Sequence, residues 1–357
     1  MYIKSLYLKN FRNFSDSTIN FSDGINVLYG DNAQGKTNII EAVWLFSSCK
    51  SFRTNNEREL INNDSQIANT FGVFARNGRE YKAEFRLNRE KRREIYLNGI
   101  KVKPKEIIGK FNSVMFYPEL LGLIKNGPDE RRKFLDFSIC QIKPAFYDIL
   151  HEYNRVLAQR NRLLKGDNRP DISVLEVWDL KLAKLSALIS KTRMEYLKKL
   201  DVFTKKLHSE ISAGKEELSL EYLTKNISYG EDEVLSLLKK ELDRDLHLGY
   251  TSVGCHKDDF EVGINGQSAR IFGSQGQQRS CVMSLKLAEA EIINRLYGEY
   301  PLILLDDVLS ELDETRREFI IDKITGKQVI ITTCEKSDFT SNSNALKICK
   351  GSVITQK

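Results

Sequence analysis

Apolar and polar side chains alternate at the start of the chain, and this alternation predicts β-strands. Residues 2–9 alternate in this way, and residues 25–29 form a second short strand that leads directly into a glycine-rich segment. Residues 37–46 then have the pattern of a helix. A strand, a glycine-rich loop and a helix therefore follow one another near the start of the chain.

A meander of strands is predicted between residues 71 and 103. Asn98-Gly99 is a strong signal for a tight hairpin turn, because both residues tolerate a positive φ. The alternating segments of this meander are residues 71–75, 81–87 and 94–97.

The pattern changes to that of helices between about residues 128 and 246. Residues 165–170 contain glycine and proline and are expected to separate two of these helices. Side chains recur at three- and four-residue spacing in the second helix. They are Leu175, Trp178, Leu182, Leu185, Leu188, Ile189, Thr192 and Tyr196.

Short strands return after residue 250, at 260–264, 302–305 and 329–331, with a turn at Asn265-Gly266. We therefore expect an α/β fold in which a mainly helical subdomain is inserted within one α/β unit. The expected parts are residues 1–110, 111–248 and 249–357.

Composition narrows the class of protein. Of 357 residues, 41% are hydrophobic and 29% charged, as in an ordinary globular protein, and the net charge of +6 permits but does not require contact with nucleic acid. The six cysteines show no CxxC spacing, so we expect reduced thiols and a cytoplasmic location rather than a zinc site. No stretch approaches the ~20 apolar residues of a membrane span.

The strongest candidate site is a phosphate-binding loop that matches G-x-x-x-x-G-K-[ST]. Glycines let backbone N–H groups approach phosphate, and the helix that follows adds its positive end. Lys36 is expected to neutralise the β- and γ-phosphates, and the Thr37 hydroxyl to ligate Mg²⁺. A glycine-rich turn without a ligand is the alternative. The loop consists of Gly30, Asp31, Asn32, Ala33, Gln34, Gly35, Lys36 and Thr37.

Residues 301–307 predict a buried strand that ends in two carboxylates. Open α/β sheets bind ligands at the carboxyl ends of their strands. Asp306 is expected to hold Mg²⁺ through water, and Asp307 stands where a general base could polarise the attacking water. The alternative is a strand followed by a helix cap, which the presence of the phosphate-binding loop disfavours.

A small polar turn at residues 274–279 precedes an apolar helical stretch. Such a turn at a helix N-terminus is another anion site, although a plain helix cap is the better explanation when the turn is taken alone. In ABC-type ATPases the signature motif lies about 30 residues before the acidic strand, as this turn does. Gln275 replaces the first glycine of the usual L-S-G-G-Q. The candidate residues are Ser274, Gln275, Gly276 and Gln277.

In combination these motifs resemble those of the RecF family, and the match covers nearly the whole chain in order. The chain differs from many relatives at Phe52, Cys255 and Lys257. The matching segments are Asn10-Phe11-Arg12-Asn13, the phosphate loop with Asn38 and Glu41, and residues 50–54, 127–136, 254–259, 274–279 and 305–313.

The resemblance implies an ABC-type ATPase head, with mixed sheets around the phosphate-binding loop (P-loop) and without a long coiled coil. RecF-like proteins bind ATP and Mg²⁺, form a homodimer with ATP and hydrolyse it slowly in a DNA-dependent way. They bind single-stranded, gapped and double-stranded DNA in recombinational repair and replication, and help RecR and RecO to load RecA. Arg12 and Asn38 would contact the nucleotide, and residues 274–277 would contact ATP held by the second subunit.

A DNA-binding surface is expected within residues 76–110, which contain twelve Lys or Arg and five Asp or Glu. On a strand, alternating lysines share one face and can follow a phosphate backbone. An ordinary solvated hairpin is the alternative. The candidates are Arg92, Arg93, Lys101, Lys103 and Lys105. By contrast, Lys198, Lys199, Lys205 and Lys206 of the helical region are interpreted as plain surface.

Two other functions stay open at this point. A subunit of an ABC transporter is disfavoured by the unconventional signature turn and the long helical insertion. An SMC-like or ABC-type ATPase could instead act as a switch that regulates a partner protein without loading RecA. Binding to gapped DNA, with and without ATP, distinguishes these functions.

Overall fold

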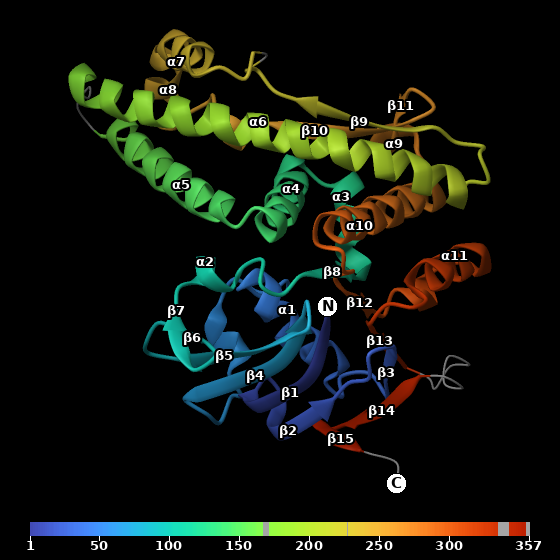
Figure 1. The fold of residues 1–357 in the computed structure, drawn as a ribbon. Coiled ribbons are helices and arrows are strands. Elements are labelled where there is room, and N and C mark those ends of the chain that lie inside the picture. Colours follow the sequence, from blue (N-terminus) through green and yellow to red (C-terminus); the bar gives the residue numbers. More distant parts are fainter. Residues whose placement is uncertain (167–170, 227, 335–342, 355–357) are drawn as a thin grey trace. The chain divides into compact units, whose positions relative to one another are not determined.

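The computed structural model describes residues 1–166, 171–226, 228–334 and 343–354. The chain forms two compact units (Figure 1). The P-loop unit comprises Met1–Leu120 with Met283–Lys357, and the helical unit comprises Leu121–Val282. Residues 167–170, which form most of the predicted break between two helices, lie outside the described residues. The unit boundaries fall after residues 120 and 282, whereas the sequence pattern suggested 110 and 248.

One sheet of the P-loop unit is an antiparallel meander with the strand order β2-β1-β4-β5-β6-β7. Its turn between β6 and β7 has positive φ at both Asn98 and Gly99, as the sequence predicts for a tight hairpin. Alternate side chains of its strands are buried, among them Leu6 and Phe74. The strands are β1 (Tyr2–Phe11), β2 (Phe14–Asn20), β4 (Ile67–Arg76), β5 (Arg79–Asn88), β6 (Glu94–Leu97) and β7 (Ile100–Val102).

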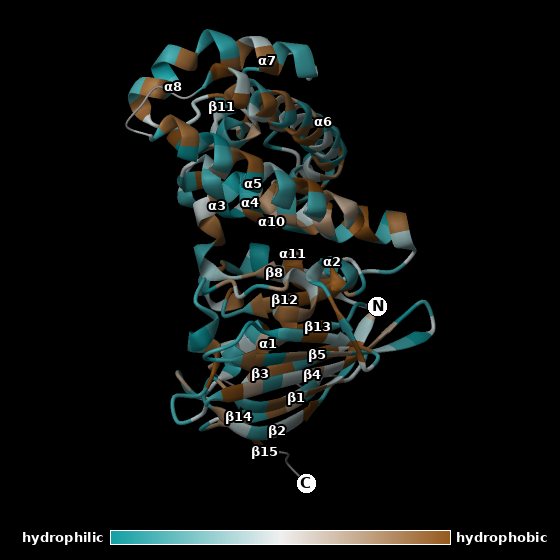
Figure 2. Cartoon of the chain, turned by 90° about the vertical axis from the view of Figure 1, so that its left-hand side faces the viewer, coloured by the Kyte–Doolittle hydropathy of each residue, from teal (hydrophilic) through white to brown (hydrophobic). Residues whose placement is uncertain are grey.

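The second sheet of this unit has the order β15-β14-β3-β13-β12-β8, and all its pairs are parallel except β14 with β15. Its central strands are apolar along most of their length, as sheets covered on both faces require (Figure 2). The strands are β3 (Ile25–Tyr29), β8 (Ser113–Phe116), β12 (Leu302–Asp306), β13 (Val329–Thr333), β14 (Asn344–Cys349) and β15 (Ser352–Ile354).

Helix α1 (Lys36–Ser48) contacts strands of both sheets and is buried over most of its length. Because β3, β12 and β13 are parallel neighbours in register, their carboxyl ends meet at one edge of the sheet. The remaining short elements are η1 (Glu57–Leu60), α2 (Pro104–Ile107), η4 (Leu309–Glu311) and α11 (Glu314–Ile324), with η2 (Pro118–Leu121) at the unit boundary.

In the helical unit, helices pack on a three-stranded sheet with the order β11-β10-β9. The strands are β9 (Leu218–Leu223), β10 (Asp259–Ile264) and β11 (Gln267–Ser268). The helices are α3 (Gly122–Lys125), α4 (Pro128–Ile142), α5 (Ala145–Leu164), α6 (Ile172–Ile211), α7 (Glu231–Lys240), α8 (Leu242–Leu248), η3 (Cys255–Lys257) and α9 (Ala269–Phe272). Helix α10 (Gln275–Tyr297) begins here and continues into the P-loop unit.

One sequence-based expectation for this region is wrong. Residues 218–223 were expected to belong to a continuous helical region, but they form strand β9, which pairs with β10 about forty residues later. A helix pattern in the neighbouring residues does not reveal such a long-range pairing. Strand β9 also packs on α6, so the sheet belongs to the helical unit.

Buried ion pairs join the motif segments of the helical unit. The Nε and Nη2 atoms of Arg131 donate to the two oxygens of the Asp259 carboxylate, at 2.7 and 2.8 Å. Arg193 makes the same bidentate contact with Asp136, at 2.7 and 2.8 Å. A buried charge requires a partner of this kind, because desolvation would otherwise be costly. Together with Arg193 of α6, residues of the 127–136 and 254–259 segments therefore hold α4, α6 and β10 together.

All six cysteines lie within the described residues and none forms a disulfide. Burial raises the pKa of the Cys49, Cys255 and Cys281 thiols to about 12, which makes them poor nucleophiles. Among the helices of the described residues, none has both the length and the apolar character needed to cross a membrane.

Candidate functional site

The P-loop connects β3 to α1 and has a backbone that glycine alone accommodates easily. Gly30 has φ 144° and Gly35 has φ 115°. A Cβ atom at Gly30 would clash with the carbonyl oxygen of Ile348, which is a backbone atom and cannot move aside without shifting β14. Glycine is therefore required at this position for steric reasons as well as for its backbone conformation.

Two segments distant in sequence support the loop. The carbonyl of Gln34 accepts hydrogen bonds from the Asn13 side chain at 2.9 Å and from the Gly351 amide at 3.0 Å. The Lys350 amide donates to the Gln34 side chain at 2.6 Å. Asn38, the predicted nucleotide contact after the loop, donates to Asn13 at 2.8 Å. The β1–β2 turn and the β14–β15 hairpin thus hold the loop from both ends of the chain.

Lys36 is buried within the P-loop. Its ammonium group donates to the carbonyl oxygens of Gly30 and Asp31, the latter at 3.0 Å. It also lies 3.8 Å from the Cys334 sulfur, and that thiol donates to the Asn32 side chain at 3.0 Å. A lysine held at the centre of the loop is suitably placed to neutralise a phosphate there.

Thr37 and Asp306, the two predicted magnesium ligands, lie in direct contact. The Thr37 hydroxyl donates to one Asp306 oxygen at 2.9 Å, and the Thr332 hydroxyl donates to the same oxygen at 2.8 Å. Burial raises the pKa of Asp306, because desolvation disfavours its charged form by more than the hydrogen bonds from Thr332 and Thr37 favour it. A hydroxyl and a buried carboxylate beside a P-loop are oxygen donors of the kind that Mg²⁺ prefers, so these residues fit the ion.

Asp307 has an unusual backbone conformation for a residue other than glycine. Its φ is 54°, and its amide donates to the Thr332 hydroxyl at 2.9 Å, while its side chain is exposed. Such conformations cost of order 1–3 kcal/mol and persist only where surrounding contacts impose them. Thr332 therefore fixes both acidic residues, a role that the sequence pattern did not identify.

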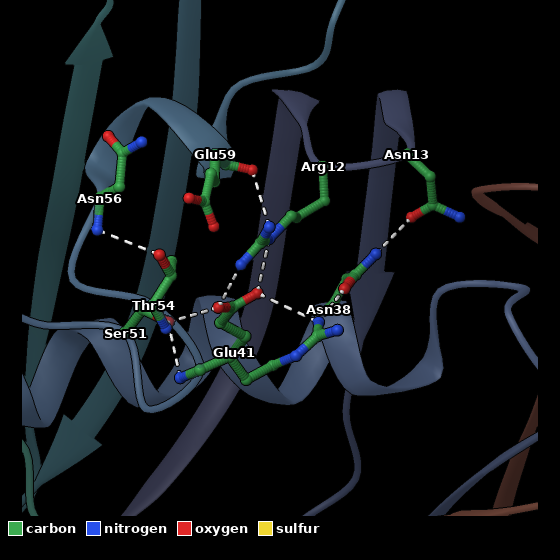
Figure 3. A network of polar contacts seen from close by, with 9 residues as sticks. Arg12, Asn13, Asn38, Glu41, Ser51, Thr54, Asn56 and Glu59 are labelled. Atoms are coloured by element: carbon green, nitrogen blue, oxygen red, sulfur yellow. Dashed lines mark hydrogen bonds and ion pairs between the residues drawn. The ribbon is translucent and has the colours of Figure 1, made fainter.

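Arg12 belongs to a buried polar network beside the P-loop (Figure 3). Its guanidinium donates to both Glu41 oxygens, at 2.9 and 2.8 Å, and to the Glu59 carbonyl at 2.8 Å. Glu41 is on α1 and is fully buried. Ser51 also donates to Glu41, and Arg53 donates to Asn38 at 2.8 Å. The predicted nucleotide contacts Arg12 and Asn38 are thus linked through α1 and residues 51–54.

The sequence analysis quoted Glu41 as part of a motif but assigned it no role. A glutamate within the otherwise apolar face of a predicted buried helix is the signal that could have identified it, because a buried acid needs cationic partners. In the structure these partners are Arg12 and Arg53, the second at 3.6 Å.

In the helical unit, the signature turn begins α10 with reciprocal capping bonds. The Gln277 amide donates to the Ser274 hydroxyl at 3.2 Å, and the Ser274 amide donates to the Gln277 side chain at 2.8 Å. The side chains of Ser274 and Gln275 remain exposed. The turn is therefore a helix cap, and its exposed side chains and helix N-terminus also provide the groups of an anion site.

A carboxylate behind the turn holds Gln277 in place. The Gln277 amide group donates to Glu216 at 2.9 Å, and the other Glu216 oxygen lies 2.9 Å from the His208 ring, near the end of α6. Gly276 completes the turn between Gln275 and Gln277. The sequence pattern gave no indication of Glu216, since it lies about sixty residues before its partner.

The structure changes the expectation for the basic hairpin. Strand β7 ends at Val102, so Lys101 is on the strand, whereas Lys103 precedes α2 and Lys105 lies within it. The three lysines therefore do not share one strand face. Lys101 pairs with Glu94, and Arg93 is half-buried and pairs with Glu57 at 2.6 Å. Arg92 is exposed.

Comparisons with known proteins extend over nearly the whole chain. A family model described as the RecF/RecN/SMC N terminal domain matches residues 2–355. The DNA replication and repair protein RecF of Clostridium botulinum (strain Loch Maree / Type A3) is 43% identical over 335 residues, which cover 93% of this chain and 92% of the relative. The protein of the same name from Lachnoclostridium phytofermentans is 41% identical and is matched over 99% of each chain.

A solved structure of the recombination mediator protein RecF, described as RecF-ATP in the RecFOR pathway, has 38% identity and a TM-score of 0.92, with 100% of this chain and 98% of that chain covered. An Smc head bound to the C-winged helix domain of ScpA has a TM-score of 0.58 at 17% identity, which indicates a shared fold alone. These likenesses confirm the expected ABC-type ATPase head with mixed sheets around a P-loop. The chain belongs to the RecF family.

Proposed function

We propose that this protein is an ATP-switched DNA-binding protein of recombinational repair and replication. In this proposal it binds single-stranded, gapped and double-stranded DNA and acts with RecR and RecO to load RecA. Support comes from relatives named DNA replication and repair protein RecF and from the solved RecF-ATP structure in the RecFOR pathway. The observation that carries it is the geometry of the candidate nucleotide site, in which the P-loop, Thr37 and Asp306 lie together.

In the proposed site, residues 30–37 bind the phosphates of ATP, Thr37 and Asp306 hold Mg²⁺, and Arg12 and Asn38 contact the nucleotide. The bound ion would offset the negative charge of the phosphates and of Asp306. Lys36 supplies a positive charge from within the loop, and the amides at the start of α1 add further donors. Asp307 would act as the general base towards the attacking water.

We further propose that ATP joins two copies of the chain. The exposed Ser274 and Gln275 side chains of one subunit, with Gly276 and Gln277, would bind the γ-phosphate held by the P-loop of the other. Loss of that phosphate removes the bridge, so hydrolysis would open the dimer. The exposure of the signature turn supports this arrangement, because a cap with a purely structural role could equally be buried.

Hydrolysis is expected to be slow and stimulated by DNA. Many ABC-type ATPases have glutamate where this chain has Asp307, whose side chain is one methylene shorter and reaches less far towards an attacking water. Purified protein that turns over ATP hundreds of times per second without DNA would contradict this expectation. The free thiols agree with the proposed cytoplasmic location.

Light scattering in ATP and in ADP tests the switch. We expect wild-type protein to dimerise in ATP alone, and Lys36→Met to remain monomeric in both nucleotides. A dimer that forms regardless of nucleotide would refute the mechanism. Binding to gapped DNA then tests the assignment to repair: ATP-dependent dimerisation without any DNA binding would favour an SMC-like switch that regulates a partner protein instead.

A further inference from the structure

The exposed face of α6, the long yellow-green helix of Figure 1, is strongly basic. Between residues 180 and 206 its exposed side chains comprise seven lysines, one glutamate and three apolar residues. The glutamate is Glu195, and the apolar residues are Leu180, Leu188 and Val202. The lysines are Lys181, Lys184, Lys191, Lys198, Lys199, Lys205 and Lys206. This set of seven is called the α6 lysine face.

Four of these lysines form a regular row. Lys184, Lys191, Lys198 and Lys205 follow one another at seven-residue intervals. Each lies about 10 Å further along the helix than the previous one and is rotated about its axis by only about 20°. The row therefore extends over about 30 Å on one side of the helix, while α4, α5, α7 and β9 pack against other parts of it.

The positive charge of this face is largely uncompensated. Lys205 pairs with Asp201 at 2.8 Å, and Lys181 lies over the Trp178 ring. Across the part of the chain that the structure describes, the other five lysines have no acidic side chain within ion-pair distance. An elongated row of exposed ammonium groups creates a continuous positive potential, which attracts a polyanion of similar length.

The basic hairpin expected from the sequence lacks both the regular row of lysines and the uncompensated charge of the α6 lysine face. Its strand stops after Lys101, and both Lys101 and Arg93 are already paired with glutamates. The α6 lysine face has more lysines, fewer acidic neighbours and a single rigid helix to hold them in line. It is the better candidate for a surface that follows a phosphate backbone, although the sequence pattern alone favoured plain surface for four of its members.

We propose that the α6 lysine face binds the sugar-phosphate backbone of DNA. This inference rests on the proposed function, because it assumes that the protein binds DNA. Lysine ammonium groups at this spacing contact phosphates and carry no means of reading bases, so binding here positions the protein on DNA without regard to sequence. The flexible side chains allow the row to adapt to duplex or gapped DNA.

The test compares two triple variants by fluorescence anisotropy on a gapped duplex, with ATP present and over a series of salt concentrations. Lys184→Gln/Lys191→Gln/Lys198→Gln removes three charges from the α6 lysine face. Lys101→Gln/Lys103→Gln/Lys105→Gln is the matched control, with the same charge change at the hairpin. Each lysine that contacts a phosphate contributes about 1 to the slope of log K against log salt.

We expect the α6 variant to bind DNA more weakly and to have a salt slope that is smaller in magnitude by about 3. The control should retain a slope close to that of the wild type. Equal slopes for the α6 variant and the wild type would overturn the inference. The α6 lysine face would then bind either an acidic protein or no partner. The single variant Lys191→Gln, with an expected change of about 1, provides the same test should the triple variant fold poorly.

Failure of this inference can be distinguished from failure of the proposed function. Wild-type protein that binds no DNA in low salt would refute the proposed function itself. Wild-type protein that binds DNA normally, together with an α6 variant of unchanged slope, would refute only the inference. Nucleotide binding by the α6 variants is a further control, because the P-loop belongs to the other unit.

Discussion

The buried carboxylate of Glu41 offers the sharpest test of the network beside the P-loop. Glu41 accepts hydrogen bonds from two nitrogens of the Arg12 guanidinium and from the Ser51 hydroxyl, and its side chain is fully buried. Glu41→Gln preserves the volume but removes the charge. The glutamine keeps one acceptor oxygen, but its NH₂ group cannot accept from Arg12, so a largely buried guanidinium loses one hydrogen bond and its counter-ion.

The magnitude follows from burial. Removing one partner of a fully buried ion pair costs about 3–5 kcal/mol. The Arg12 side chain is 17% exposed and that of Arg53 is 44% exposed, so water compensates for part of the loss. We therefore expect Glu41→Gln to lower the free energy of unfolding by roughly 2–3 kcal/mol. For a unit of about 200 residues this corresponds to a decrease in Tm of about 4–12 °C.

Thermal unfolding followed by circular dichroism measures this decrease, with separate fits if the two units unfold in separate transitions. Glu59→Gln is the matched control, because only the backbone carbonyl of Glu59 contacts Arg12 and the same charge is removed. A double-mutant cycle that combines Glu41→Gln with Arg12→Met isolates the interaction between these two side chains, and we expect a coupling energy of about 2 kcal/mol. Additive effects of the two substitutions would refute the reasoning.

Three further predictions concern other parts of the two units. Thr332→Val should reduce ATP turnover more than ATP affinity, because it frees Asp306 and Asp307; a radiolabelled phosphate-release assay beside a binding titration separates these quantities. Glu216→Ala removes the hydrogen bond that holds Gln277 and should cost about 1.4 kcal/mol of dimerisation free energy. The dissociation constant of the ATP-dependent dimer, measured by light scattering, should rise about tenfold, while ATP binding by the P-loop should not change. Burial lowers the pKa of His256 from 6.5 to about 4, so between pH 4 and pH 6.5 the His256 ring takes up a proton when the protein unfolds. The helical unit should therefore lose stability in urea titrations as the pH falls from 6.5 towards 4, and His256→Gln should reduce that dependence.

Local patterns in the sequence predicted the parts of the candidate nucleotide site that are formed by neighbouring residues. The P-loop lies between a strand and a helix that start and end close to their predicted positions. The strand that carries Asp306 was predicted because a run of apolar residues followed by acids is a local signal. The hairpin turn at Asn98-Gly99 was predicted for the same reason, since the two residues define their own backbone conformation.

Features that depend on distant partners were not predicted. Thr332 acts through Asp306, which lies in a neighbouring strand, and Glu216 acts through Gln277. The lysine pattern at residues 101–105 alternates as in a strand, but Pro104 cannot donate to a ladder hydrogen bond and instead begins α2. A two-residue period is therefore insufficient evidence for a strand where a proline interrupts it.

The distribution of arginine and lysine shows why net charge is a poor guide to the proposed DNA-binding surface. In the helical unit, Arg131 of the 127–136 motif and Arg193 of α6 are both buried in bidentate contacts with aspartates. Their planar guanidinium groups suit such fixed pairs, and the paired charges contribute little to the field outside the molecule. The lysines of the α6 lysine face stay in water, where their charge attracts a polyanion. Arg131 and Arg193 thus stabilise the fold, whereas the lysines proposed to meet DNA lie on a helix face that carries no motif.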